Sequence, residues 1–332
     1  MRKKMIFFII VFIFALAAGG LCFFLGWQKP VNEGRIVVLK VESGMSASQI
    51  AQLLEEKGII RSARVFLAQT KARGMENALQ AGEYELISGM TEQSILEKMA
   101  SGDVRTVKFT IPEGFNVKEI AALLAKNGLA GADEFLAAAK DYTPYEYMKT
   151  GSRLIEYKSE GFLFPSTYSV SASAGGKAIL AMLVREFDQQ LTKDMREKLR
   201  KKNMSVRDFV TLASLVEKEA AVAEDRKFIA KAFLKRLDID MPLQSCATIQ
   251  YILGYPKPEL TIADTKLPSE YNTYLHYGLP PGPIANPGLL SMQSVLNPAK
   301  EDYLYFVAQK NGQHIFSYTY DEHLQAIEKA SR

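Results

Sequence analysis

An uncharged stretch opens the chain. The basic residues Arg2, Lys3 and Lys4 precede a run from Met5 to Trp27 that carries no charged side chain. A membrane-spanning helix needs about 20 apolar residues, and basic residues before the span favour a cytoplasmic N-terminus. The pattern therefore predicts a cytoplasmic tail over residues 1–4 and a transmembrane anchor over residues 5–27. The rest of the chain then lies outside the cytoplasm, as in a single-pass protein of the cell membrane.

A cleaved signal peptide is the alternative for this stretch. Such a peptide would use small residues before its cleavage site and Cys22 as a lipid acceptor; the small residues are Ala15, Ala17 and Ala18. However, the apolar run continues over residues 23–25, and Leu21 is a poor residue to precede a lipidated cysteine. The anchor interpretation is therefore favoured.

A short unit of strand, glycine turn and capped helix recurs beyond the anchor. Its three copies span residues 36–58, 109–128 and, in a shorter form, 84–96. Each copy has alternating apolar residues, which predict a strand, and then a polar helix-capping residue: Ser46, Asn116 and Thr91. In each copy an isoleucine lies six residues after the turn glycine. Such α+β modules bind ligands or act as spacers, and both roles stay open here.

An aromatic segment punctuated by glycine and proline follows over residues 142–173. It is typical of an ordered loop. Phe162 and Phe164 could stack on sugar rings or fill the core. Two charged helices are predicted next, one over residues 176–202 and one from the N-cap Ser205 to about Leu237.

Two glutamates flank the apolar stripe of the second helix. Glu217 and Glu219 are two residues apart, so they project from nearly opposite sides. Small residues one turn before and after Glu217 leave room for a ligand, whereas Leu215, Val216 and Val222 give Glu219 a packed setting. A carboxyl group screened from water retains its proton, as a general acid must. Either glutamate could serve, or both could be ordinary surface acids.

The downstream segment is rich in turn-formers and small polar residues. They fall in three blocks: 244–248, 271–274 and 278–287. Proline rings restrict the backbone of the last block, and a rigid loop beside a groove can position a substrate. A structural crossover is the alternative.

Other chemistries fit the sequence less well. Cysteine hydrolysis would pair Cys246 with one of the histidines His276, His314 and His323, but the segment shows no glycine turn or helix start that would activate the thiol. The histidines show no metal-ligand spacing, and no phosphate-binding loop is present. With Cys22 in the apolar run, a disulfide framework is not expected. A net charge of +4, spread along the chain, does not predict a nucleic-acid partner.

Several motifs, in order, resemble the YceG-like endolytic murein transglycosylases. The matching segments are Leu215–Glu219, Gln244, Tyr271–Tyr274, Gly278–Pro287, Asn297–Ala299 and Tyr303–Val307. The resemblance covers nearly the whole chain and implies an α+β fold without cofactor or metal. After the transmembrane helix it implies a linker over residues 28–36, a small LysM-like α+β module over residues 37–107 and a larger α+β catalytic domain over residues 108–332.

The resemblance also implies which residues act. Glu217 occupies the position of the catalytic glutamate, and the expected substrate-binding residues are Gln244, Ser245, Thr248, Asn272, Thr273, Tyr274, Pro280, Pro281 and Asn286. One departure stands out, because Cys246 and Ala247 replace the Asp-Pro pair of many members. A lytic transglycosylase needs neither a water-activating base nor an enzyme nucleophile, so one carboxyl suffices.

The implied reaction is an internal cut of nascent peptidoglycan strands. It breaks the bond between N-acetylmuramic acid and N-acetylglucosamine and leaves a 1,6-anhydro end, with Glu217 as general acid and then base. Glycan strands are the expected partner, with penicillin-binding synthases of the elongation or division machinery beside them. The alternative is a non-catalytic, membrane-anchored scaffold that binds peptidoglycan.

Overall fold

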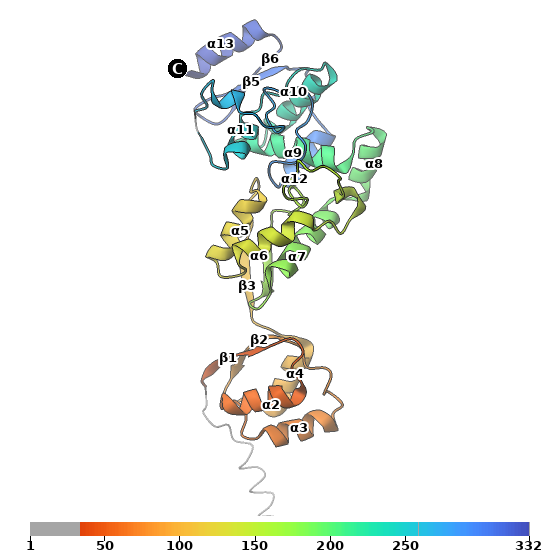
Figure 1. Cartoon of the computed structure of the whole chain (residues 1–332), viewed down its shortest axis with the longest axis vertical. Helices are drawn as coiled ribbons and strands as arrows, with labels where there is room; N and C mark the ends of the chain where they lie inside the picture. Colours follow the sequence, from red (N-terminus) through yellow and green to blue (C-terminus); the bar gives the residue numbers. More distant parts are fainter. Residues whose placement is uncertain (1–33, 258, 332) are drawn as a thin grey trace, which may run out of the picture. The chain divides into compact units, whose positions relative to one another are not determined.

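The computed structural model describes residues 34–257 and 259–331 (Figure 1). The predicted cytoplasmic tail, the transmembrane anchor and most of the linker lie outside these residues. Over the described ranges, no helix has the length and apolar character needed to cross a bilayer. These residues form two compact units. The first runs to Val107 and includes Ser169–Ser173; the second comprises Lys108–Tyr168 and the described residues from Ala174 onward.

Between Gly34 and Val107, the first unit contains two complete strands and three helices. In chain order they are β1 (Ile36–Val41), α2 (Ala47–Glu56), α3 (Ala63–Ala72), β2 (Gly82–Ile87) and α4 (Glu92–Ser101). β1 and β2 pair antiparallel, from Ile36 opposite Ile87 to Val41 opposite Gly82. α2 packs against α3, and α3 packs against α4. One apolar core joins them, with Phe66, Tyr84 and Leu54 fully buried.

The predicted repeats begin the helices of this unit. Ser46 forms a capping box with Gln49 at the start of α2, and the Thr91 hydroxyl accepts from the Ser94 N–H at the start of α4. The first and third copies therefore share one sheet, because their strands are β1 and β2. Helix α3, which lies between them, was not predicted.

The second unit is mostly helical. Its elements are β3 (Thr106–Thr110), which begins just before the unit, α5 (Val117–Lys126), α6 (Ala132–Asp141), β4 (Thr167–Ser171), whose residues from Ser169 onward belong to the first unit, α7 (Gly176–Gln190), α8 (Lys193–Lys201), α9 (Val206–Glu219), α10 (Arg226–Asp238), α11 (Cys246–Leu253), α12 (Leu289–Leu296), β5 (Tyr305–Ala308), β6 (His314–Ser317) and α13 (Tyr320–Ser331), with short 3-10 turns at Glu146–Met148 and Asp264–Lys266. β3 pairs with β4 and β5 with β6. The α+β prediction is confirmed in this form: a mixed, mainly helical fold with small two-stranded sheets.

The second repeat opens this unit as predicted. β3 leads into α5, whose N-cap Asn116 forms a capping box with Glu119. The aromatic segment after α6 is ordered, and its phenylalanines belong to the core: Phe162 is fully buried with its ring edge-on to Phe187. Core filling therefore explains Phe162 and Phe164 better than sugar stacking does.

The long helix predicted from Ser205 to about Leu237 is wrong, because the structure has two helices there. α9 ends at Glu219, since Ala220 adopts an extended conformation (φ −81°, ψ 113°), and α10 starts only at Arg226. The predicted helix over residues 176–202 is also divided. Thr192 caps α8 by accepting from the Met195 N–H after α7 has ended. The first break places Glu217 and Glu219 in the last turn of α9.

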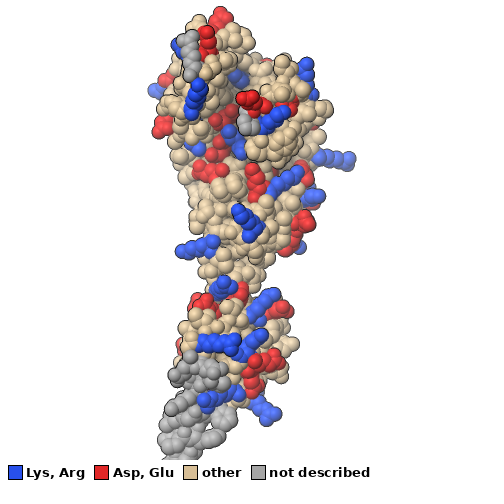
Figure 2. Space-filling view, turned by 90° about the vertical axis from the view of Figure 1, so that its left-hand side faces the viewer, with Lys and Arg blue, Asp and Glu red and all other residues tan. Residues whose placement is uncertain are grey.

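The proline-rich block after Gly278 is packed into the second unit. Residues 282–288 are buried. Gly161 lies against this block in the left-handed region (φ +85°), where a Cβ atom would come within 2.5 Å of the Pro283 ring. Only glycine fits at that position without displacing the proline. On the face shown in Figure 2, Lys and Arg are interspersed with Asp and Glu in both units.

Candidate active site

Glu219 lies in the wall of a cavity of about 400 Å³ in the second unit. The cavity is enclosed by polar side chains from four segments: Arg236 of α10, Gln244 and Cys246 before and at the start of α11, Tyr274, and His314 of β6. α13 closes one side with Tyr320, His323 and Ile327, which recur at helical spacing. Glu219 is the sole carboxylic acid among the described residues that line this cavity.

The Glu219 carboxyl group is held in place and screened from water. The Ser245 hydroxyl donates to Glu219 Oε1, and the Ala247 backbone N–H donates to the same carboxyl group. Burial raises the pKa of Glu219 above 4.5; these hydrogen bonds and the nearby His314 and Arg236 oppose that shift without cancelling it. Glu219 therefore favours its protonated form more than an exposed glutamate does.

Three predicted substrate-binding residues lie behind Glu219 and support it. The Ser245 N–H donates to the Thr273 hydroxyl at 3.0 Å, and the Thr248 hydroxyl donates to the Ser245 carbonyl at 2.8 Å. The Thr248 and Thr273 hydroxyls are themselves 3.0 Å apart. All three residues are buried. Their arrangement orients the Ser245 hydroxyl toward Glu219 and leaves them out of reach of a substrate.

Gln244 and Tyr274, two further residues predicted to bind substrate, line the cavity. Gln244 is exposed and has a left-handed backbone (φ 49°), which is uncommon for glutamine, and its N–H donates to the Thr273 carbonyl at 3.0 Å. The Tyr274 hydroxyl lies 3.1 Å from Cys246 Sγ. Both side chains are thus presented to whatever occupies the cavity.

His314 and Arg236 supply basic side chains to the wall of the cavity. Asp225 Oδ2 accepts from the His314 backbone N–H at 2.7 Å and lies 2.9 Å from His314 Nδ1. A carboxylate at Nδ1 requires that nitrogen to carry a proton, so Nε2 is left for the cavity. Arg236, 7% exposed, donates to the carbonyls of Leu304 and Leu243 at 2.8 and 2.6 Å. Both side chains are therefore fixed by their own hydrogen bonds.

Cys246 is placed differently from the sequence prediction. It is the first residue of α11, so a helix start is present after all. Burial nevertheless raises the pKa of the thiol, and its hydrogen-bond partner is Tyr274. His314 and His323 line the same cavity, yet neither ring hydrogen-bonds to the thiol in the described part of the chain; His276 instead faces Glu270 at 3.9 Å. This environment does not favour a reactive thiolate.

Glu217, the predicted catalytic residue, has a different environment. Its side chain is 6% exposed, Oε1 lies 3.2 Å from Arg226 Nη2, and Oε2 accepts from the Gly288 N–H at 2.9 Å. The carboxylate thus ties α9 to the first residue of α10 and to the N-cap of α12. Glu113 lies nearby, and burial together with the Glu217 charge raises the pKa of Glu113.

Two sequence-based interpretations of these glutamates therefore need correction. The small residues after Glu217 do not open space for a ligand, because the helix ends before Ala221 and Arg226 occupies the carboxylate. Glu219 is not packed into the core, since it faces the cavity. The apolar neighbours that suggested packing, Leu215 and Val216, are fully buried one turn before Glu219, which is the last residue of α9.

The remaining predicted substrate-binding residues brace loops or lie away from the cavity. Asn272 donates from Nδ2 to the carbonyls of Thr265 and Leu267 at 3.1 and 2.9 Å. Asn286 donates to the Phe115 carbonyl at 2.8 Å. Both asparagines are fully buried. Pro280 and Pro281 are not among the residues that line the Glu219 cavity.

Arg236 and Asp225 were missed by sequence reasoning. Arg236 is one of many cations on a charged helix, and its role depends on carbonyls of distant loops. Asp225 follows Glu224 in a charged segment whose sequence is typical of a solvent-exposed helix surface. No local pattern separates either residue from its neighbours.

The fold and the site describe a mainly helical α+β protein with a polar cavity, in which desolvation raises the pKa of one carboxyl group, that of Glu219. The model of the YceG-like family matches residues 39–329, so the chain belongs to the YceG-like family. The predicted resemblance is confirmed.

The chain is similar to endolytic murein transglycosylases of other bacteria over most of its length. The endolytic murein transglycosylase of Bacillus subtilis (strain 168) is 34% identical over 305 residues, covering 88% of this chain and 84% of that protein. The endolytic murein transglycosylase of Streptococcus pneumoniae serotype 2 (strain D39) is 32% identical, covering 92% of this chain and 61% of that protein. A crystal structure of a YceG-like protein from Listeria monocytogenes is similar with a TM-score of 0.62 at 35% identity, covering 88% and 99% of the two chains.

Proposed function

We propose that this protein is a lyase of the cell wall, a lytic transglycosylase that cuts peptidoglycan glycan strands. The names of its relatives support the reaction class. The observation that carries the proposal is the Glu219 cavity: a polar cavity with one carboxyl group whose pKa is raised by burial. A hydrolytic glycosidase usually needs a pair of carboxyl groups flanking the scissile bond.

The chemistry requires one group to act twice. Protonated Glu219 donates its proton to the glycosidic oxygen that leaves C1 of N-acetylmuramic acid. The resulting carboxylate then accepts the proton of the same sugar's 6-hydroxyl as that oxygen bonds to C1, which gives a 1,6-anhydro end. Because this hydroxyl is already tethered near C1, water competes poorly with it.

We assign the acid and base role to Glu219 instead of Glu217. The Glu217 carboxylate is engaged by Arg226 and by the Gly288 N–H and presents little surface, because its side chain is only 6% exposed. Glu219 has the opposite setting. After proton donation, its carboxylate would be stabilised by the Ser245 hydroxyl and by the charge of Arg236.

The place of the cut and the location of the enzyme are further parts of this proposal. Residues 5–27 would anchor the protein in the cell membrane, with the N-terminus in the cytoplasm. The catalytic domain would then act outside the membrane, on nascent strands, at internal bonds and beside a penicillin-binding synthase. The first unit, as a LysM-like module, would bind the glycan or hold the catalytic domain away from the bilayer.

Product analysis tests the proposed reaction. The full-length protein in detergent is incubated with uncrosslinked glycan strands, and the fragments are identified by mass spectrometry. Fragments with 1,6-anhydro ends are expected, and long fragments at early times indicate internal cuts. Reducing ends would mean a hydrolase, and intact strands that stay bound would support the scaffold alternative.

A further inference from the structure

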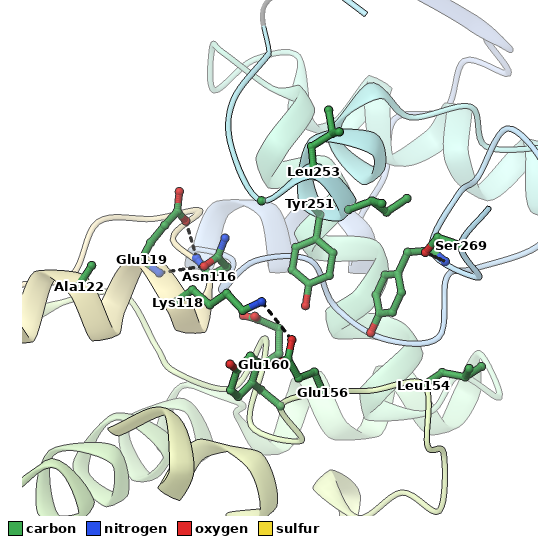
Figure 3. A pocket seen from close by; sticks show the side chains of 14 residues that line it. Asn116, Lys118, Glu119, Ala122, Leu154, Glu156, Glu160, Tyr251, Leu253 and Ser269 are labelled. Atoms are coloured by element: carbon green, nitrogen blue, oxygen red, sulfur yellow. Dashed lines mark hydrogen bonds and ion pairs between the residues drawn. The ribbon is translucent and has the colours of Figure 1, made fainter. Parts of the chain in front are cut away.

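A second and larger cavity of about 550 Å³ lies beside the C-terminal end of α11 (Figure 3). Its size falls within the roughly 300–1,000 Å³ of small-molecule sites. Figure 3 shows Tyr251 projecting from α11 into the cavity, opposite Lys118 of α5 and Glu156 and Glu160 of the ordered loop. Among the described residues, none lines both this cavity and the Glu219 cavity. The cavity is therefore separate from the proposed site of cleavage.

Three tyrosines are among the described residues that line it, and two of them, Tyr251 and Tyr271, pack ring against ring. The rings of Tyr251 and Tyr271 lie 5.1 Å apart, inclined by 39°. Tyr271 is only 8% exposed, and neither hydroxyl group forms a hydrogen bond within the described part of the chain. Neither oxygen is among the buried polar atoms without a partner, so both hydroxyl groups reach the solvent of the cavity. They are therefore free to hydrogen-bond with the polar groups of a ligand.

The interior of this cavity carries little charge. Both Glu160 oxygens accept from the Val117 N–H at 3.1 Å, and Asn286 Nδ2 donates to Oε1 at 3.3 Å. Burial raises the pKa of Glu160 to about 8, so the group is mostly protonated at neutral pH. At the rim, Lys118 and Glu156 neutralise each other at 3.1 Å. These contacts favour an uncharged, hydroxyl-rich ligand over an ion.

α11 connects this cavity with the site of cleavage. Cys246, its first residue, lines the Glu219 cavity, while Tyr251 and Gly254 near its end line the second one. The rise of a helix places these positions about 8–12 Å apart along the axis. A smaller cavity between them is lined by Lys218, Ala247 and Gln250 and shares Tyr251 and Gly254 with the second cavity. α11 thus borders both cavities, and Lys218 of α9 lines the smaller cavity next to Glu219.

We propose that the Tyr251–Tyr271 cavity binds a neutral N-acetylhexosamine residue of a glycan strand, apart from the sugars at Glu219. The sugar's C–H face would lie on a tyrosine ring, and its hydroxyl and acetamido groups would hydrogen-bond to the two free phenol groups. This inference rests on the proposed function for the identity of the polymer. A second grip on the strand would hold it across α11 while Glu219 acts.

Hydroxyl-only substitutions test the site. Tyr251→Phe and Tyr271→Phe are made in the full chain carrying Glu219→Gln, and the binding of the β-1,4-linked N-acetylglucosamine tetramer is measured by calorimetry. Each change removes a hydroxyl group that has no partner in the fold, so folding should be unaffected. Tyr277→Phe, at a tyrosine that is 68% exposed and lines neither cavity, is the matched control.

Loss of either hydroxyl group should raise the Kd for the tetramer about five-fold, which is the ordinary effect of removing one hydrogen bond. The Tyr251→Phe and Tyr271→Phe proteins should therefore bind the tetramer about five-fold more weakly than the parent, and Tyr277→Phe should bind like the parent. Unchanged binding in both variants would overturn the inference. So would Tyr251-dependent binding of peptide-bearing strands but not of the bare tetramer, because the ligand would then be a stem peptide.

The proposed function can fail independently of this site. If wild-type protein leaves strands uncut while tetramer binding still depends on Tyr251, the cavity is a sugar site on a scaffold. If strands are cut to anhydro ends while both phenylalanine variants bind normally, the reaction stands and the second sugar site does not.

Discussion

The last turn of α9 places two glutamates in opposite electrostatic settings. Glu217 meets a guanidinium group at 3.2 Å and a backbone N–H at 2.9 Å, contacts that stabilise a carboxylate. For Glu219 the cost of burial exceeds the help of Ser245, Arg236 and His314. The same residue type, two positions apart, is thus suited to an ion pair in one case and to proton transfer in the other.

Substituting Glu217 should affect stability. Glu217→Gln leaves the Arg226 charge buried without its partner, which costs about 3 kcal/mol when a buried ion pair is broken. Denaturant unfolding of the variant should show this loss, while turnover per folded molecule should stay near that of wild type. Glu224→Gln, at an exposed neighbouring position, is the control and should change neither quantity.

Glu160 should make the stability of the second unit depend on pH. Its pKa is raised to about 8 in the folded protein against 4.5 for the free side chain, so the folded state holds an extra proton between these values. Stability is therefore highest below about 4.5 and declines as the pH rises to about 8, by a few kcal/mol. Glu160→Gln should flatten the dependence of Tm on pH. An unchanged slope in that variant would assign the effect to another group.

The sequence identified both glutamates but not the difference between them. Apolar neighbours along one helix could be inferred from spacing, and either residue could then be the acid. The groups that separate them, such as Arg226, Ser245 and Gly288, come from other segments and meet the glutamates only after folding. Asn272 and Asn286 were predicted to bind substrate for the same reason. Their position in polar loops does not reveal that both side chains are fully buried.

At the scale of elements, the helix starts could be predicted from neighbouring residues, whereas the helix break that depends on distant segments could not. The helix starts at Ser46, Thr91 and Asn116 follow from side-chain to backbone contacts within three residues, and all three are present. The break after Glu219 could not be predicted, because a run of helix-forming residues continues across it. Contacts of Asp225 with His314 and of Arg226 with Glu217 and Ser291 hold this break.

The capping box of α2 gives a prediction for the first unit. Ser46→Ala removes the acceptor of the Gln49 N–H and should lower the free energy of unfolding by about 1 kcal/mol. Hydrogen exchange of the α2 amide groups reports this unit separately from the second. Ser43→Ala, at an exposed serine in the preceding turn, is the control. Equal exchange rates in both variants would mean that the capping box contributes little to the stability of the first unit.

At the scale of the whole molecule, the chain combines two compact units with an N-terminal stretch that we propose to be a membrane anchor. The α+β class was predictable because strand and helix periodicities alternate along the sequence. The pairing of β1 with β2 and the assembly of the cavity from α9, α10, α11 and β6 were not, since they depend on contacts between distant segments.

Removing residues 1–27 tests the anchor. The full-length protein should be recovered in the membrane fraction of cells and released by detergent but not by salt. The shortened protein should be recovered without detergent and should cut isolated strands at a similar rate, because the Glu219 cavity lies wholly in the second unit. Release of the full-length protein by salt alone would contradict the anchor.

The assignment of Glu219 is tested most directly by comparing products of three proteins on uncrosslinked glycan strands. Mass spectrometry should find 1,6-anhydro ends with wild type and with Glu217→Gln, and none with Glu219→Gln, which should stay folded and still bind the strands. Anhydro ends formed by Glu219→Gln at the wild-type rate, or their loss in a folded Glu217→Gln protein, would contradict the account.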